Sequence, residues 1–185
     1  MNLIFVVVVI LVLAILLVGG GYNRLVMGRN RVTNAWAQID VQLKRRHDLI
    51  PNLVNTVKGY LQHEKDVLER VTAARERAIA AGGDVAARAP AEQALTSAVR
   101  SLFAVVEAYP DLKANQNMLA LQEEISLTEN RIGFARQSYN DAVMFYNTAC
   151  QSFPANIIAG LFGFRPQTLF AVEDAAERAV PLVRF

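Results

Sequence analysis

The sequence predicts an all-α protein in which an N-terminal transmembrane helix is followed by an antiparallel helical bundle with long heptad-patterned helices. Three observations support this prediction. No charged side chain occurs in the first 23 residues. In the rest of the chain, long segments between prolines and glycines carry apolar residues that recur every seven positions. No segment alternates between apolar and polar residues with a period of two, so no sheet is expected.

The N-terminal segment has the length and composition of a membrane anchor, to which we assign residues 1–23. Residues 3–18 are all Leu, Ile, Val, Phe or Ala. Adding residues 19–22 reaches the roughly 20 residues that a helix needs to cross about 30 Å of hydrocarbon. The alternative is a cleaved signal peptide with its cleavage site near Val18-Gly19-Gly20. Because the preceding Met1-Asn2 carries no Lys or Arg, the retained anchor is favoured.

Basic residues directly after the anchor predict its orientation. Arg24, Arg29 and Arg31 follow the span, and positively charged flanks stay in the cytoplasm. We therefore expect a single-pass protein with a short N-terminus outside and the body in the cytoplasm. The same arginines are candidate contacts to anionic headgroups, while the alternative is charge complementarity along the bundle.

Residues 24–153 are expected to form the bundle. The first helix is expected to run from the anchor to about Ala81, with a kink or short break near Pro51 that Asp48 is available to cap. A second helix is expected at about 91–109 and a third at about 115–152. Their apolar positions predict coiled-coil-like packing. The first helix has two such seams: Trp36, Leu43, Ile50, Val57, Val71 and Ala78, and Ile39, Leu53, Tyr60, Val67 and Ala74, the second of which is interrupted by Arg46. The apolar side of the second helix consists of Leu95, Val99, Leu102, Val106 and Tyr109. The third helix has two seams: Met118, Ile125, Ile132, Tyr139, Tyr146 and Phe153, and Leu121, Thr128, Ala135, Ala142 and Ala149.

Residues 154–185 are expected to form an apolar tail with a short helix at about 171–179. The segment 157–164 is strongly apolar and contains two glycines. One interpretation is that it folds over the end of the bundle and closes the core. The alternative is a contact with the membrane interface or with another subunit. The candidate contact residues are Ile157, Ile158, Leu161, Phe162 and Phe164.

Polar residues inside the helical pattern are the candidate functional positions. Glu129 is expected to pair with Arg45 or Arg46, and Asp48 with Arg131 or Arg136. A buried polar network that sets the helix register is one interpretation. The alternative is a groove that binds a peptide or a lipid. The candidate set is Arg45, Arg46, Asp48, Asn52, Glu129, Arg131, Arg136, Asn140, Tyr146 and Asn147.

No recognisable constellation for catalysis, metal binding or phosphate binding is present. His47 and His63 are the two histidines, and neither has the HExxH or ExxH spacing of metal sites. The chain has no G-x-S-x-G or phosphate-loop motif, and Cys150 has no histidine near it in sequence. We therefore expect no enzymatic activity, cofactor or metal. A formal net charge of +2 argues against a nucleic-acid partner.

Several ordered motifs together resemble the LemA family. They are Arg45-Arg46-His47-Asp48-Leu49-Ile50-Pro51-Asn52-Leu53-Val54, Tyr109-Pro110-Asp111-Leu112-Lys113-Ala114-Asn115, Leu121-Gln122-Glu123-Glu124, Glu129-Asn130-Arg131-Ile132, Tyr139-Asn140, Tyr146-Asn147, residues 159–164 and the closing residues 181–185. The resemblance covers nearly the whole chain. It implies a bacterial protein with an N-terminal membrane anchor and an antiparallel helical bundle. One branch of the family is associated with magnetosome formation, and no motif here singles out that branch.

These inferences favour a membrane-anchored, non-enzymatic helical scaffold at the cytoplasmic face of a bacterial membrane. We expect it to contact the lipid bilayer, to form a homo-oligomer and to organise membrane-protein partners whose identity the sequence does not define. The alternative is a peptide- or lipid-binding module that uses the polar stripe of the third helix.

Overall fold

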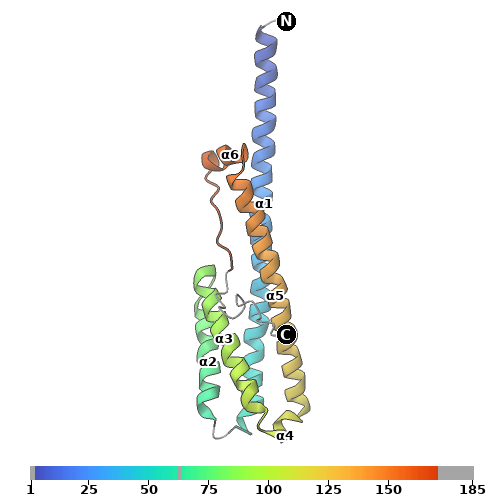
Figure 1. The fold of residues 1–185 in the computed structure, drawn as a ribbon, viewed down its shortest axis with the longest axis vertical. Helices are drawn as coiled ribbons and strands as arrows, with labels where there is room; N and C mark the ends of the chain where they lie inside the picture. Colours follow the sequence, from blue (N-terminus) through green and yellow to red (C-terminus); the bar gives the residue numbers. More distant parts are fainter. Residues whose placement is uncertain (1–2, 62–63, 171–185) are drawn as a thin grey trace, which may run out of the picture. The chain divides into compact units, whose positions relative to one another are not determined.

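The computed structural model describes residues 3–61 and 64–170, and every regular element within these ranges is a helix (Figure 1). The helices are α1 (Leu3–Lys58), α2 (Lys65–Ala80), α3 (Val85–Val106), α4 (Pro110–Lys113), α5 (Gln116–Gln151) and α6 (Ala155–Phe162). The predicted all-α class is confirmed. The short helix expected at about 171–179 lies outside the described residues.

The chain divides into two compact units. The anchor unit comprises residues 3–42 and 131–169, and the four-helix unit comprises Leu43–Asn130 together with Phe170. Helices α1 and α5 each contribute residues to both units. The expected division into an anchor, a bundle and a tail is a division along the chain, and it remains a prediction.

The anchor unit begins with the apolar part of α1. This helix contains an 18-residue window with a mean hydropathy of 3.4, none of which is buried inside the protein. It is therefore long and apolar enough to cross a membrane. Beyond this window α1 packs against α5, whose direction is opposite. Trp36 contacts Tyr139 with ring centroids 5.4 Å apart, whereas Arg24, earlier in α1, faces Phe145, later in α5.

The four-helix unit encloses an apolar core between the end of α1, α2, α3 and the beginning of α5. Leu61 and Leu112 are buried in this core although the sequence pattern did not predict them. The other buried members come from the predicted apolar positions, which confirms most of the heptad pattern. They include Ile50, Leu53, Val57, Val71, Ala78, Leu95, Leu102 and Met118. Tyr60 and Phe153 are corrections: both were expected in the core, and both are exposed. Tyr60 lies just beyond the end of α1 and Phe153 just beyond the end of α5, where the helical period no longer applies.

The break in the first predicted helix is displaced from its expected place. The helix α1 continues through Pro51 and ends at Lys58, directly before Gly59, and α2 begins at Lys65. Asp48 is consequently an exposed residue within α1 and caps no helix. Glycine is a poorer helix former than the residues around it, which accounts for the end at Lys58.

Three other boundaries have local causes. The helix α3 begins at Val85, six residues earlier than expected, because the carboxylate of Asp84 accepts a hydrogen bond from the backbone N–H of Ala86 at 3.1 Å. The side chain of Asn115 accepts from the N–H groups of Asn117 and Met118 at the start of α5. Gly82 follows α2 with φ +64°, a conformation that glycine adopts without strain.

Candidate functional site

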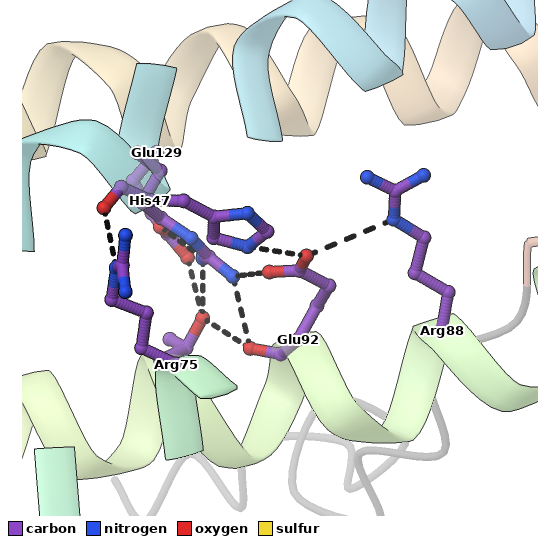
Figure 2. A network of polar contacts seen from close by, with 7 residues as sticks. His47, Arg75, Arg88, Glu92 and Glu129 are labelled. Carbon is purple, nitrogen blue, oxygen red and sulfur yellow. Dashed lines mark hydrogen bonds and ion pairs between the residues drawn. The ribbon is translucent and has the colours of Figure 1, made fainter. Parts of the chain in front are cut away.

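A cluster of charged and polar side chains lies inside the four-helix unit (Figure 2). We call it the ion cluster. Four helices contribute to it: α1, α2, α3 and α5. Its members are Arg46, His47, Arg75, Arg88, Glu92, Thr96 and Glu129.

Arg46 is the centre of the ion cluster, and only 2% of its surface is exposed. Its guanidinium donates to the Glu129 carboxylate at 2.7 Å and to the Thr96 hydroxyl at 2.9 Å. It also donates to the carboxylate and the backbone carbonyl of Glu92. Thr96 in turn lies 2.9 Å from the second carboxylate oxygen of Glu129. One guanidinium thus binds α1 to both α3 and α5, in the charge-assisted geometry that gives the strongest protein hydrogen bonds.

Glu92 is the buried anion that this guanidinium neutralises. Its second carboxylate oxygen lies 2.9 Å from Nε2 of His47 and 3.9 Å from Nε of Arg88 (Figure 2). Burial by itself raises the pKa of Glu92, but the hydrogen bond from His47 and the charge of Arg46 outweigh it, so the pKa lies below its ordinary value. Glu92 is therefore ionised at neutral pH inside the bundle.

Arg75 explains how α1 passes through Pro51. A proline has no N–H, so the carbonyl four residues earlier, that of His47, loses its donor within the helix. The Nε of Arg75, on α2, donates to this carbonyl at 2.7 Å. The arginine restores the missing hydrogen bond, and the helix continues instead of breaking.

The chemistry that the ion cluster supports is structural. Both of its carboxylates are bound by arginine, which leaves little attraction for a metal cation. Among the described residues no group of three or more His, Cys, Asp or Glu side chains is placed to hold a metal ion. A cavity of about 250 Å³ lies beside Arg46 and Glu129, with an apolar wall of Val99, Phe103 and Ile125.

The structure brings together some of the predicted polar residues. The expected pair between Arg46 and Glu129 is confirmed. Arg45 instead forms a half-exposed ion pair with Glu124 at 2.7 Å. Asn52 is exposed, and its backbone carbonyl accepts from the Thr56 hydroxyl within α1.

Asp48 belongs to the four-helix unit, whereas Arg131 and Arg136 belong to the anchor unit. Their expected pairing stays a prediction. Asn140 is half-buried on α5.

Sequence reasoning missed five members of the ion cluster: His47, Arg75, Arg88, Glu92 and Thr96. A signal for two of them was present. The buried positions of α3 follow the steps of three and four residues from Val106 back through Leu95 to Glu92 and Arg88. Extending the apolar side of this helix by one more heptad would have placed both charged residues in the core.

The second part of the predicted polar stripe lies in the anchor unit and contacts the chain itself. Both halves of the Asn147 amide bind the backbone of Gln167, each at 2.8 Å. The Tyr139 hydroxyl donates to the carbonyl of Thr168 at 2.9 Å. These contacts hold residues 167 and 168 along α5.

Tyr146 is buried where α1 and α5 approach each other. A Cβ atom at Gly28 would lie 3.1 Å from the Tyr146 ring, so the missing side chain of Gly28 allows this approach. Burial, together with the neighbouring Cys150 thiol, raises the pKa of Tyr146 to about 12. The phenol is therefore neutral at physiological pH, and Tyr146 acts as a packing residue.

The arginines that follow the apolar segment lie over aromatic rings. The guanidinium carbons of Arg24 and Arg31 both lie 5.7 Å from the Phe145 ring centroid, and that of Arg29 lies 5.3 Å from the Phe164 ring. Such cation–π contacts leave the charge accessible at one side.

The candidate contact residues of the tail, which lie in and just after α6, fall into two groups. Ile158 and Phe164 are buried, whereas Ile157, Leu161 and Phe162 are exposed. Both interpretations of the tail, closure of the core and contact with the membrane or another subunit, stay predictions.

A shallow groove of about 480 Å³ lies between α1 and α5 of the anchor unit. Small side chains line much of it, including Ala37, Ala135 and Ser138. Two large apolar residues of the groove, Val41 and Phe134, are 63% and 72% exposed. Buried Oε1 of Gln42, another lining residue, has no hydrogen-bond partner among the described residues.

Comparison with known proteins assigns the chain to a family. The sequence model of the LemA family matches residues 35–185. The chain belongs to the LemA family. It is 29% identical over 144 residues to Protein LemA of Metamycoplasma hominis, an alignment that covers 76% of this chain and 64% of that protein. The chain thus spans about two thirds of the length of this relative.

Two further relatives of the chain carry magnetosome names. Magnetosome protein MamQ 2 of Paramagnetospirillum magneticum is 24% identical over 184 residues, covering 86% of this chain and 68% of that protein. Magnetosome protein MamQ of Magnetospirillum gryphiswaldense is 21% identical, covering 78% of this chain and 62% of that protein. None of these three relatives has the name of an enzyme. With the apolar part of α1, the relatives support a membrane-associated protein.

Proposed function

We propose that this LemA-family protein is a non-enzymatic, membrane-anchored scaffold that self-associates at the cytoplasmic face of a bacterial membrane. The continuity of α1 supports the anchoring, because one helix carries the apolar segment and part of both units. Arg24, Arg29 and Arg31 support a cytoplasmic body, since basic flanks are retained on that side. The relatives, whose names include LemA and magnetosome proteins and no enzyme, agree with this proposal.

The exposed apolar face around Phe134 is the observation that carries self-association. A phenylalanine with 72% of its surface exposed stands beside a groove floored by alanine and serine. Exposed apolar patches of this kind mark interaction sites in soluble parts of proteins.

A second copy of the chain is the proposed occupant of this groove. A two-fold symmetric contact places the same patch on both partners, and the patch of the anchor unit contains both a projecting Phe134 and a groove. A symmetry axis along the membrane normal keeps both anchors in the same bilayer. Anchoring also confines the copies to two dimensions, which raises their effective concentration.

The test is the mass of the full-length protein in mild detergent, measured by native mass spectrometry. We expect a discrete multimer for the natural sequence and a monomer for Phe134→Ser. Leu119→Ser is the matched control, because Leu119 is another exposed apolar residue of α5 and lies outside the groove. A monomeric natural protein, or equal dissociation by both substitutions, would contradict the proposal.

A binding module based on the polar stripe of α5 is the second candidate. The observation in its favour is the clamp in which Asn147 binds both backbone groups of Gln167, as a side chain does when it recognises a peptide. The chain's own residues occupy this clamp, so we rank it second.

Hydrogen exchange of the Gln167 amide in the full-length protein tests the second candidate. Asn147→Ala is expected to accelerate the exchange about fivefold, since one hydrogen bond contributes about 1 kcal/mol. Asn52→Ala, at an exposed position of α1, is the control. If a peptide with the sequence of residues 164–170, added to the natural protein with Asn147 intact, does not accelerate the exchange of the Gln167 amide, no peptide competes for the clamp and its role is purely structural.

A further inference from the structure

The exposed face of α6 is an apolar surface with no cover in the described chain. It consists of Ile157, Leu161 and Phe162, with Phe153 just before the helix. Leu161 and Phe153 are 76% and 80% exposed. The opposite face of the helix, formed by Ala155, Ile158 and Ala159, is buried. One face of α6 is therefore buried and the other is exposed, although Asn156 is the one polar residue of the helix.

The contacts of the buried face place α6 at a definite point along α1. A Cβ atom at Gly21 would collide with the side chain of Ile158, so the absence of a side chain at Gly21 admits the helix. Tyr22 packs edge-on against Phe162 and Phe164, with ring centroids 5.0 Å and 5.6 Å apart. Figure 1 shows α6 beside α1.

The position of these contacts coincides with the expected surface of the bilayer. A helix rises about 1.5 Å per residue, so the residues from Leu3 to Tyr22 span about 30 Å, the thickness of the hydrocarbon core. Gly21 and Tyr22 close this span, and α6 packs on them. Amphipathic helices bound at an interface bury their apolar face about 5–10 Å into the boundary between headgroups and acyl chains.

The charges near α6 fit an anionic surface. Residues 3–39 and 142–170 contain no Asp or Glu, and they carry Arg24, Arg29, Arg31 and Arg165. Arg29 lies over the Phe164 ring, directly beside the contacts of α6. Basic residues near a membrane surface contribute about 1 kcal/mol each toward anionic lipids. A second copy would bring like charges to the same place, which disfavours self-association through this face.

From these observations we propose that α6 is an interfacial helix that inserts Ile157, Leu161 and Phe162 into the headgroup region of an anionic bilayer. The chain thereby contacts the membrane twice, through the apolar part of α1 and through α6. The second contact restrains the tilt of α1 and the orientation of the anchor unit. This inference rests on the membrane anchoring in the proposed function and is independent of self-association.

Fluorescence of a single tryptophan in nanodiscs tests the proposal. The full-length chain with Trp36→Phe and Leu161→Trp is inserted, one chain per disc, into phosphatidylcholine and phosphatidylglycerol with brominated acyl chains. We expect blue-shifted emission that falls to about half or less of its intensity in unbrominated lipid, because the ring lies at the depth of an interfacial helix. The matched control carries Ile79→Trp in place of Leu161→Trp, at a half-exposed apolar position of α2, and should not be quenched.

Either of two results would overturn the proposal. Solvent-like emission without quenching at position 161 would show that α6 faces water. Blue-shifted emission without quenching would show that protein covers the face. Since each disc holds one chain, failure of self-association leaves the expected result unchanged, and the two proposals fail separately.

Discussion

The four-helix unit and the anchor unit treat polar and apolar side chains in opposite ways. The four-helix unit buries Arg46, His47, Arg88 and Glu92 and connects them through the ion cluster. The anchor unit places Arg24, Arg29 and Arg31 over aromatic rings at its surface and leaves large apolar residues such as Phe134 and Leu161 exposed. The four-helix unit pairs its buried charges with one another, whereas the anchor unit exposes apolar side chains that a membrane or another protein can cover.

This difference suggests a division of labour within one chain. A buried ion pair needs excellent geometry to offset the loss of hydration, so it favours one arrangement of the helices over alternatives. We therefore expect the ion cluster to define the register of α1, α2, α3 and α5. The exposed residues of the anchor unit bury little surface within the described chain, so we expect them to contribute little to folding and propose the bilayer and a second copy as their contacts.

The largest expected effect is the loss of Arg46. Arg46→Met leaves the carboxylate of Glu92 buried without its main counter-charge, and we expect a loss of about 3–5 kcal/mol in the free energy of unfolding. Arg45→Met is the neighbouring control, because its partner Glu124 is half exposed and such pairs contribute at most about 1 kcal/mol. Urea denaturation in mild detergent, followed by circular dichroism, measures both. Equal losses for the two substitutions would remove the distinction between a buried and a surface charge.

The next effect concerns Arg75 and Pro51. Arg75→Met removes the donor to the His47 carbonyl, and we expect a loss of about 1.5–3 kcal/mol, the range for hydrogen bonds from charged groups. In a Pro51→Ala background the alanine N–H supplies the missing donor, so the same substitution should cost about 1 kcal/mol less. The cycle uses the same denaturation measurement, with Arg77→Met as the surface control on α2. An unchanged cost in the alanine background would refute the link between the two residues.

The pH dependence of stability is expected to reflect Glu92. Its pKa in the folded protein is lowered, so the unfolded chain binds a proton first as the pH falls. The stabilisation is present above the ordinary pKa of a glutamate and is lost as the pH decreases toward the lower folded pKa. The slope of unfolding free energy against pH between neutral and acidic conditions should therefore be shallower for Glu92→Gln. Identical slopes would show that Glu92 contributes nothing to acid sensitivity.

The smallest effect is expected for the arginines of the anchor unit. Arg31→Met removes one cation–π contact with Phe145, and a contact of this kind at an exposed site contributes about 0.5–1 kcal/mol. The same unfolding experiment measures it, with Arg100→Met as a control on the surface of α3. A loss comparable to that of Arg46→Met would mean that the anchor unit also depends on its charges for folding.

Much of the fold could be predicted from the sequence. The apolar run of residues 3–18 predicts a spanning helix because its length matches the hydrocarbon core. The seven-residue seams predict the buried faces of α1, α3 and α5 because helical periodicity is local. The pair between Arg46 and Glu129 was predictable since Arg46 interrupts an apolar seam and has to find a counter-charge.

Other features depended on contacts between residues far apart in the chain. The sequence marks Pro51 as a site of helix disruption, but Arg75, 24 residues later, supplies the lost hydrogen bond and α1 continues. Glu92 looks like a surface residue until the packing of α3 against α1 places it beside Arg46 and His47. Asn147 belongs to a polar stripe by spacing, and only the return of the chain at Gln167 gives it a partner. Length, apolar composition and heptad spacing act within a helix, so the sequence alone determined the helical class, the apolar N-terminal segment and most of the buried helix faces. Only the tertiary structure decided which charges are buried, which apolar faces stay exposed, and that Arg75 donates to the His47 carbonyl. These features depend on residues of neighbouring helices.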